Sequence, residues 1–167
     1  MGTSVSSLHI SFVGRANVGK SRLIDCIFNE GNTNSTKFQQ VETESKTESV
    51  ITLPNRELTI AETVIVDEKV ELGLTNEAFS NSDFFILVLD AREELFNIET
   101  KLISYFQKER IPFLVAVNKI EYGTNPHLIS ELDALEVTYF EVSCKENAGI
   151  ESFKKNLIHM LPDEKQI

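Results

Sequence analysis

The chain contains the stretch Gly14-Arg15-Ala16-Asn17-Val18-Gly19-Lys20-Ser21, which follows an apolar run at 8–13 and precedes apolar residues with helical spacing at 23–28. A strand, a glycine-rich turn and a helix start in this order direct several backbone N–H groups and the positive end of the helix dipole to one point. The glycines permit close backbone approach, the lysine reaches terminal phosphates, and the serine hydroxyl can ligate Mg²⁺. The stretch therefore predicts a loop that binds the phosphates of a nucleotide.

Length, charge and cysteine content limit the class of protein. The 167 residues are enough for one domain with a full core, so we expect a single domain over residues 1–167. The net charge of −10 argues against a protein that grips nucleic acid through its overall field. No apolar run is long enough to cross a bilayer and the first residues do not resemble a signal peptide, so we expect a cytoplasmic protein without membrane contact. Cys26 and Cys144 have no metal-binding spacing and are expected to be free thiols.

Apolar runs and helical spacings alternate along the chain. Phe84–Leu89 and Ile111–Val117 are continuous apolar runs, typical of parallel strands buried on both faces. Helical spacing lies between them at 98–106, and a further strand at 138–142 precedes an amphipathic helix at 150–161. This order predicts a doubly wound α/β sheet of six mostly parallel strands, with the ligand at the carboxyl ends of the strands.

A polar tract follows the first helix. Residues 29–46 contain few apolar side chains, which predicts a mobile loop, and its place after the phosphate loop suits a nucleotide-sensing switch. Ser49–Leu53 and Leu58–Val66, separated by a turn that contains Pro54, predict an antiparallel hairpin at one edge of the sheet.

Two polar motifs stand where buried strands end. Asn118-Lys119-Ile120-Glu121 follows one strand, and Ser143-Cys144-Lys145 follows another. Together with the phosphate loop, these motifs resemble those of the Era/TrmE-like group of small GTPases, which have a phosphate-loop NTPase fold with a Ras-like sheet. The resemblance implies binding of GTP and GDP with Mg²⁺.

Within that group, the chain is similar to the GTPase domain of the HydF family of [FeFe]-hydrogenase maturation factors. The similarity covers nearly the whole chain, and Asp67-Glu68-Lys69-Val70-Glu71-Leu72-Gly73 resembles a stretch after the second switch of that family. This resemblance implies a role in metallocofactor maturation. The iron–sulfur ligands of the family have no counterparts in these residues, so no cluster is expected in this chain.

The resemblance implies roles for individual residues. Asn118 would bond the base edge, Lys119 would pack over the ring, and the backbone at Cys144 would read the guanine carbonyl. The carboxylate of Glu121, in place of the family's aspartate, would accept bonds from two guanine donors. The full set of implied nucleotide-binding residues is Arg15, Ala16, Asn17, Val18, Gly19, Lys20, Ser21, Arg22, Asn118, Lys119, Glu121, Ser143, Cys144 and Lys145.

The second switch departs from the family. The family's Asp-Thr-Pro-Gly falls on Glu62-Thr63-Val64-Ile65, so isoleucine replaces the glycine that approaches the γ-phosphate. Ser21, Thr47 and Glu62 are the implied Mg²⁺ ligands, with Asp67 as the alternative acid and Thr43 as a second candidate for the switch threonine. Asn17 occupies the position at which related GTPases hold K⁺, although asparagine also stabilises turns by itself.

Two functions are compatible with these residues. One is a Mg²⁺-dependent GTPase in which Lys20 and Thr47 act on the phosphates, and which is slow because no glutamine is placed to orient water. The other is a degenerate module that binds GTP or GDP with little or no hydrolysis. In either case, a protein partner or a second copy of the chain would contact the switch regions.

Overall fold

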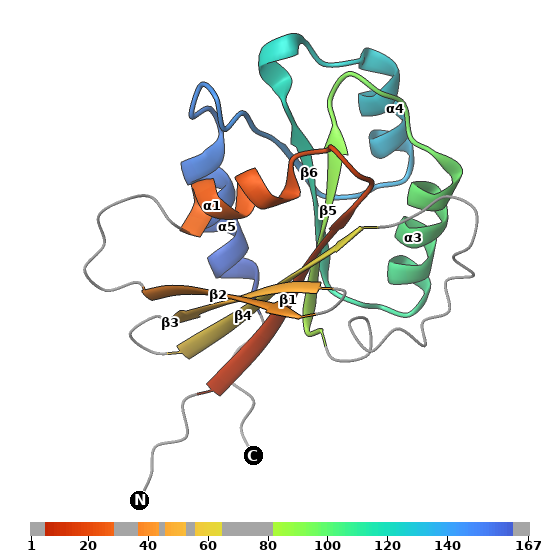
Figure 1. Cartoon of the computed structure of the whole chain (residues 1–167). Helices are drawn as coiled ribbons and strands as arrows, with labels where there is room; N and C mark the ends of the chain where they lie inside the picture. The colour runs from red at the N-terminus through yellow and green to blue at the C-terminus, as the bar shows by residue number, and fades with distance from the viewer. Residues whose placement is uncertain (1–5, 29–36, 44–45, 53–55, 65–81, 162–167) are drawn as a thin grey trace, which may run out of the picture.

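The computed structural model describes residues 6–28, 37–43, 46–52, 56–64 and 82–161. Its strands form one sheet in the order β2-β3-β4-β1-β5-β6-β7 (Figure 1). The strands are β1 (Ser6–Gly14), β2 (Lys37–Thr43), β3 (Lys46–Thr52), β4 (Arg56–Val64), β5 (Phe84–Asp90), β6 (Phe113–Asn118) and β7 (Tyr139–Glu141). The helices are α1 (Lys20–Phe28), α3 (Asn97–Lys108), α4 (Pro126–Ala134) and α5 (Ile150–Met160), with a 3₁₀ turn, η1, at Ile120–Tyr122.

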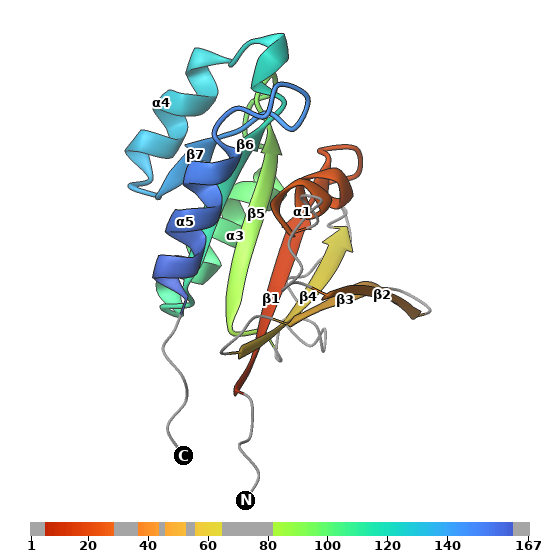
Figure 2. The same ribbon diagram turned by 90° about the vertical axis from the view of Figure 1, so that its left-hand side faces the viewer.

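Five neighbouring strands, β4, β1, β5, β6 and β7, run parallel. Helices α1 and α5 cover one face of this sheet, and α3 and α4 cover the other (Figures 1 and 2). The predicted doubly wound α/β fold is therefore confirmed. Because the strands are parallel, their carboxyl ends meet at one edge, where β1 leads into the phosphate loop and β6 leads into η1.

The sheet has an apolar core on each face, one against α1 and α5 and a second against α3 and α4. Both arise because successive side chains of a buried strand point to opposite faces. In β5, Phe84, Ile86 and Val88 pack on the α1 and α5 face, whereas the intervening residues pack on the α3 and α4 face. All seven residues of β5 are buried. A strand that is apolar at every position can satisfy both faces, which explains the continuous apolar runs in the sequence.

The β2 edge of the sheet differs from expectation. The sheet has seven strands in the described part of the chain, not six, because β2 forms within the tract that was predicted to be a loop. Strand β3 pairs antiparallel with β4, with Thr47 opposite Glu62, and β2 pairs antiparallel with β3. Few residues of β2 are apolar, so composition alone missed a strand whose backbone pairs with β3. The first part of the tract, 29–36, lies outside the described residues.

Phe106 on α3 is the centre of an aromatic cluster in the second core. Its side chain is fully buried, and its ring centroid lies 4.7 Å from that of Phe85 and 5.1 Å from that of Phe113. We predict that Phe106→Ala lowers the free energy of unfolding by about 3–5 kcal/mol, because it leaves a cavity between helix and sheet. Urea denaturation measures this change. Ile158→Ala, at a half-exposed position on α5, is the control and should shift the value by less than about 0.5 kcal/mol.

Candidate nucleotide-binding site

The loop between β1 and α1 requires glycine at both of its glycine positions. A Cβ atom on Gly14 would lie 2.7 Å from the Val88 carbonyl oxygen, and a Cβ atom on Gly19 would lie 2.6 Å from Asn118 Nδ2. Gly19 also has φ +91°, which favours glycine. The glycines therefore let the loop pack against the ends of β5 and β6.

Lys20 is folded back into this loop. Its ammonium donates hydrogen bonds to the carbonyl oxygens of Gly14 (3.0 Å) and Arg15 (2.9 Å), and the residue is only 4% exposed. Burial lowers the pKa of Lys20 below its usual value, and the nearby carboxylate of Glu62 opposes this shift. A phosphate bound in the loop would give this buried cation a counter-charge.

The carboxylate of Glu62, on β4, lies beside Ser21 at the end of the phosphate loop. Ser21 Oγ lies 2.7 Å and 2.8 Å from the two carboxylate oxygens of Glu62, which is carried by β4. A hydroxyl and a carboxylate are hard oxygen ligands of the kind Mg²⁺ prefers. Within the described residues, no group of three or more histidine, cysteine or acidic side chains could hold a metal alone. The Ser21 hydroxyl and the Glu62 carboxylate would supply two oxygen ligands to Mg²⁺, and phosphate and water would fill its other positions.

The other predicted metal ligands are placed only in part. Thr47 lies on β3, and its backbone is opposite Glu62, one strand further from the phosphate loop. Asp67, Ile65 and the HydF-like stretch 67–73 lie outside the described residues. Of the two acids considered, Glu62 is the one that the described residues place beside Ser21.

The end of β6 is tied to the phosphate loop by two side chains. Asn118 Nδ2 donates to the carbonyl oxygen of Val18 (3.0 Å), and Lys119 Nζ donates to the carbonyl oxygen of Asn17 (2.6 Å). Asn118 is buried, and Lys119 adopts the left-handed conformation with φ 68°. Residues 100 positions apart thus form one unit at the carboxyl edge of the sheet.

Glu121 is held by the second polar motif. Ser143 Oγ donates to Glu121 Oε1 (2.7 Å) and accepts from the backbone N–H of Glu146 (3.0 Å). Desolvation raises the pKa of Glu121, but the hydrogen bond from Ser143 and further favourable contacts outweigh it, so the net pKa lies below its usual value. Glu121 is therefore an ionised acceptor at neutral pH.

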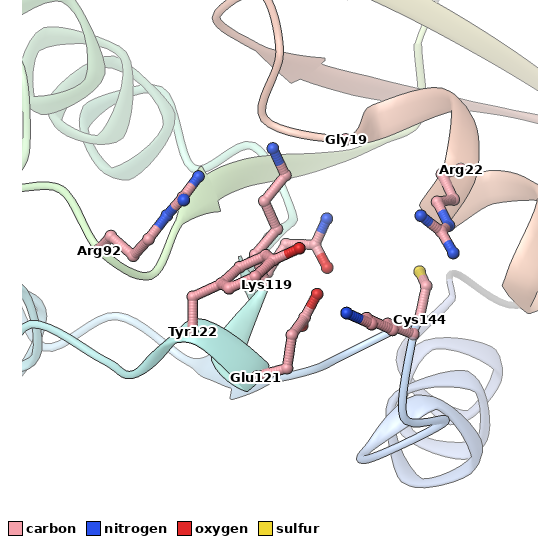
Figure 3. Close-up of a pocket in the computed structure, with 9 residues that line it drawn as sticks. Gly19, Arg22, Arg92, Lys119, Glu121, Tyr122 and Cys144 are labelled. Atoms are coloured by element: carbon pink, nitrogen blue, oxygen red, sulfur yellow. The ribbon is translucent and has the colours of Figure 1, made fainter.

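A cavity of about 260 Å³ lies beside Gly19, and Asn118, Lys119 and Glu121 are among the residues that line it. Figure 3 shows that the side chains of Lys119, Tyr122, Glu121 and Cys144 come from the β6 end and the 143–145 loop, while Arg22 faces them from α1. The lining residues are Gly19, Arg22, Arg92, Asn118, Lys119, Glu121, Tyr122, Cys144 and Lys145.

Sequence reasoning missed Arg92 and Tyr122. Arg92 follows Asp90 at the carboxyl end of β5 and donates to both of its carboxylate oxygens, at 3.0 Å and 2.8 Å. This hydrogen bonding lowers the pKa of Asp90. Tyr122 directly follows Glu121. Both residues come shortly after the carboxyl end of a buried strand, and this position in the sequence could have identified them as candidates.

Arg15, a predicted nucleotide-binding residue, is not among the residues that line the cavity. Its guanidinium contacts Glu93 (2.7 Å) and Glu99 (3.2 Å), and it lies 3.5 Å above the Phe96 ring centroid. Glu99 is buried, and desolvation raises its pKa despite the neighbouring Arg15. The side chain of Arg15 therefore anchors the loop to the start of α3. The neighbouring Ala16 is exposed.

Both cysteines are free and partly buried, as expected. Burial, and next the hydrogen bond with the Cys26 thiol, raise the pKa of Cys144 to about 12. The side chain of Cys144 is therefore a neutral thiol in the cavity wall at physiological pH. No helix in the described part of the chain is long and apolar enough to span a membrane.

The family model described as 50S ribosome-binding GTPase matches residues 9–119, which is more than half of the chain. The chain therefore belongs to this GTPase family. Among curated proteins, it is 25% identical over 162 residues to the tRNA modification GTPase MnmE of Finegoldia magna, covering 93% of the chain and 35% of the relative. It is 26% identical over 125 residues to GTPase Der of Sulfurimonas denitrificans, covering 70% of the chain and 25% of the relative. The chain thus spans only about a third and a quarter, respectively, of the length of these relatives.

Solved structures share the fold. A variant of Aquifex aeolicus Era bound to GDP·AlF4⁻ aligns with a TM-score of 0.70 and 19% identity, covering 95% of the chain and 58% of that structure. Translation elongation factor SelB of Methanococcus maripaludis aligns with a TM-score of 0.68 and 16% identity, covering 99% of the chain and 36% of that structure. The predicted membership of the Era/TrmE-like class is confirmed: this is a GTP-binding domain of the Era, MnmE and Der type.

Gly19 and Gly123 offer a matched test of the contact between the loop and β6. Both have positive φ, +91° and +96°, but a Cβ atom on Gly123 would meet no atom within 4 Å. We predict that Gly19→Ala destabilises the nucleotide-free protein by at least about 1 kcal/mol more than Gly123→Ala, because only the former adds a clash to the backbone strain. Urea denaturation of both variants measures the difference. Equal losses would show that the loop can move away from Asn118 freely.

Proposed function

We propose that the chain binds GTP and GDP with Mg²⁺ and hydrolyses GTP slowly to GDP and phosphate. The observation that carries this proposal is the union of a phosphate loop and a base-recognition motif through the bonds from Asn118 and Lys119 to the loop carbonyls. Such an arrangement fixes the distance between a bound base and its phosphates before the ligand arrives.

The phosphate side supplies charge and positioning. Lys20 would donate to the terminal phosphates, and Ser21 and Glu62 would hold Mg²⁺, with Thr47 as a further ligand and Asp67 as the alternative acid. A bound Mg²⁺ would neutralise charge on the phosphate oxygens. The 2.7 Å contact between Ser21 and Glu62 supports the choice of Glu62, because it places a carboxylate beside the serine hydroxyl.

The base side supplies selectivity. The ionised carboxylate of Glu121 would accept from guanine N1–H and the exocyclic amine, a donor pair that adenine lacks. The hydrogen bond from Ser143 supports this role because it fixes one carboxylate oxygen. Asn118 would contact the base edge, Lys119 would pack on the ring, and the backbone N–H at Cys144 would bind the guanine carbonyl.

The placement of the arginines supports the proposal that hydrolysis is slow. In the described part of the chain, Arg15 is engaged by Glu93 and Glu99, and Arg92 is engaged by Asp90. Arg22 lines the cavity on the base side. Lys20 would therefore neutralise transition-state charge without help from these arginines, and arginine assistance is a large term in phosphoryl transfer.

Three finer assignments belong to the same proposal. K⁺ binds near the exposed Asn17 and stimulates hydrolysis, as the family position implies. The domain serves metallocofactor maturation of the HydF kind in the cytoplasm, an assignment carried by the stretch 67–73. A protein partner or second copy contacts the switch regions. The net charge of −10 argues against binding nucleic acid through the overall field of the chain.

Nucleotide titration and phosphate release test the proposal together. We predict that GDP and GTP bind in Mg²⁺ more tightly than ATP, and that Lys20→Ala weakens both at least about tenfold because it removes charge-assisted bonds to phosphate. Lys155→Ala, at an exposed position on α5, is the control and should bind as the unchanged chain does. Isothermal titration measures affinity, and phosphate release is followed in K⁺ and Na⁺ buffers.

Each outcome has a separate meaning. Release above the blank that disappears in Lys20→Ala supports the enzyme. Guanine-nucleotide binding without release in K⁺ supports the alternative, a regulatory module with little or no hydrolysis. Equal affinity for ATP and GTP would contradict the role of Glu121, and absence of binding would refute the whole proposal.

A further inference from the structure

Tyr122 is the most exposed of the large apolar side chains in the described part of the chain. It is 56% exposed, and the others are Ile158 (44%) and Met160 (41%). Those two lie on α5, whereas Tyr122 ends the η1 turn and lines the cavity beside Gly19. An aromatic ring in the wall of an open cavity is available to a ligand.

Two cations flank the ring. Arg92 Cζ lies 4.9 Å from the ring centroid, and Lys145 Nζ lies 5.6 Å from it. Arg92 is itself fixed by Asp90, so the ring has a defined support on that side. In Figure 3 the hydroxyl of Tyr122 points toward the middle of the residues that line the pocket.

We propose that Tyr122 is the aromatic platform on which the nucleobase stacks. The proposal rests on the proposed function, because it assigns a second role within the same base site. Every nucleobase presents a π-face, so stacking on tyrosine strengthens binding without distinguishing one base from another. Discrimination then belongs to Glu121, whose carboxylate reads the guanine donors.

Adjacent residues thus divide affinity and selectivity between them. Glu121 contacts the edge of the base in the plane of the ring, and Tyr122 contacts its face. This division gives a signature that a structural role for Tyr122 would not give. Loss of the Tyr122 ring lowers the affinity for every nucleotide by the same factor, whatever its base. Loss of the Glu121 charge changes the ratio of the affinities for nucleotides with different bases.

Affinity measurements on matched nucleotides test this signature. GDP and IDP differ by the exocyclic amine, and inorganic tripolyphosphate carries no base. We expect Tyr122→Ala to lower the affinities for GDP and IDP by the same factor, about tenfold, and to leave the affinity for tripolyphosphate unchanged. Tyr122→Phe should stay within about threefold of the unchanged chain, since the ring is kept. Glu121→Gln should weaken GDP more than IDP.

Intrinsic fluorescence gives a second readout that does not depend on affinity. The chain has no tryptophan and three tyrosines, Tyr105, Tyr122 and Tyr139. Stacking on a base should quench Tyr122, so saturating GDP should reduce the emission of the unchanged chain and of Tyr105→Phe. The reduction should disappear in Tyr122→Phe, which still binds GDP. Met160→Ala, which shortens another exposed apolar side chain, is the control and should keep the GDP-induced reduction in emission.

The outcomes separate the two proposals. GDP binding by Tyr122→Ala with unchanged affinity would overturn the platform, as would an equal loss for GDP and tripolyphosphate or a quench retained in Tyr122→Phe. Each of these results would leave the proposed function standing. Failure of the unchanged chain to bind GDP would instead refute the proposed function, and the platform with it.

Discussion

The hydrogen bond from Asn118 Nδ2 to the Val18 carbonyl is the interaction on which the site depends. It joins the end of β6 to the phosphate loop across 100 residues of sequence at 3.0 Å. The bond is possible because position 19 carries no side chain, since a Cβ atom there would lie 2.6 Å from the same nitrogen. Lys119 adds a second bond to the loop at Asn17. Gly19 thus permits the contact between the phosphate loop and the end of β6, in addition to any contact with phosphate.

Two glutamates are held in the same way on the two sides of the site. Each contacts a serine hydroxyl at 2.7 Å: Ser21 for Glu62 and Ser143 for Glu121. In the proposed assignment, both glutamates take the place of motif aspartates, and the serine contacts would keep an acidic oxygen in position despite the extra methylene.

The sequence predicted the parts of the molecule that buried strands and motif spacing define. The runs at 84–89 and 111–117 appear as β5 and β6, and the phosphate loop lies between β1 and α1. Strand β2 was missed because few of its residues are apolar, whereas its backbone pairs with β3 in the folded sheet. Helix α4 was missed although Asn125 caps it by accepting from the His127 N–H. Arg92 and Tyr122 were missed because their role depends on which strand ends are neighbours, a property of the folded sheet.

Through its hydrogen bond to the Val18 carbonyl, the base-side residue Asn118 would hold the phosphate loop in its binding conformation. Titration with inorganic tripolyphosphate tests this role, because the ligand has phosphates and no base for Asn118 to contact. We predict that Asn118→Ala weakens tripolyphosphate binding at least about fivefold, since the Val18 carbonyl loses its donor. Unchanged tripolyphosphate affinity in Asn118→Ala, together with a loss of GDP affinity, would contradict this role and restrict Asn118 to contact with the base.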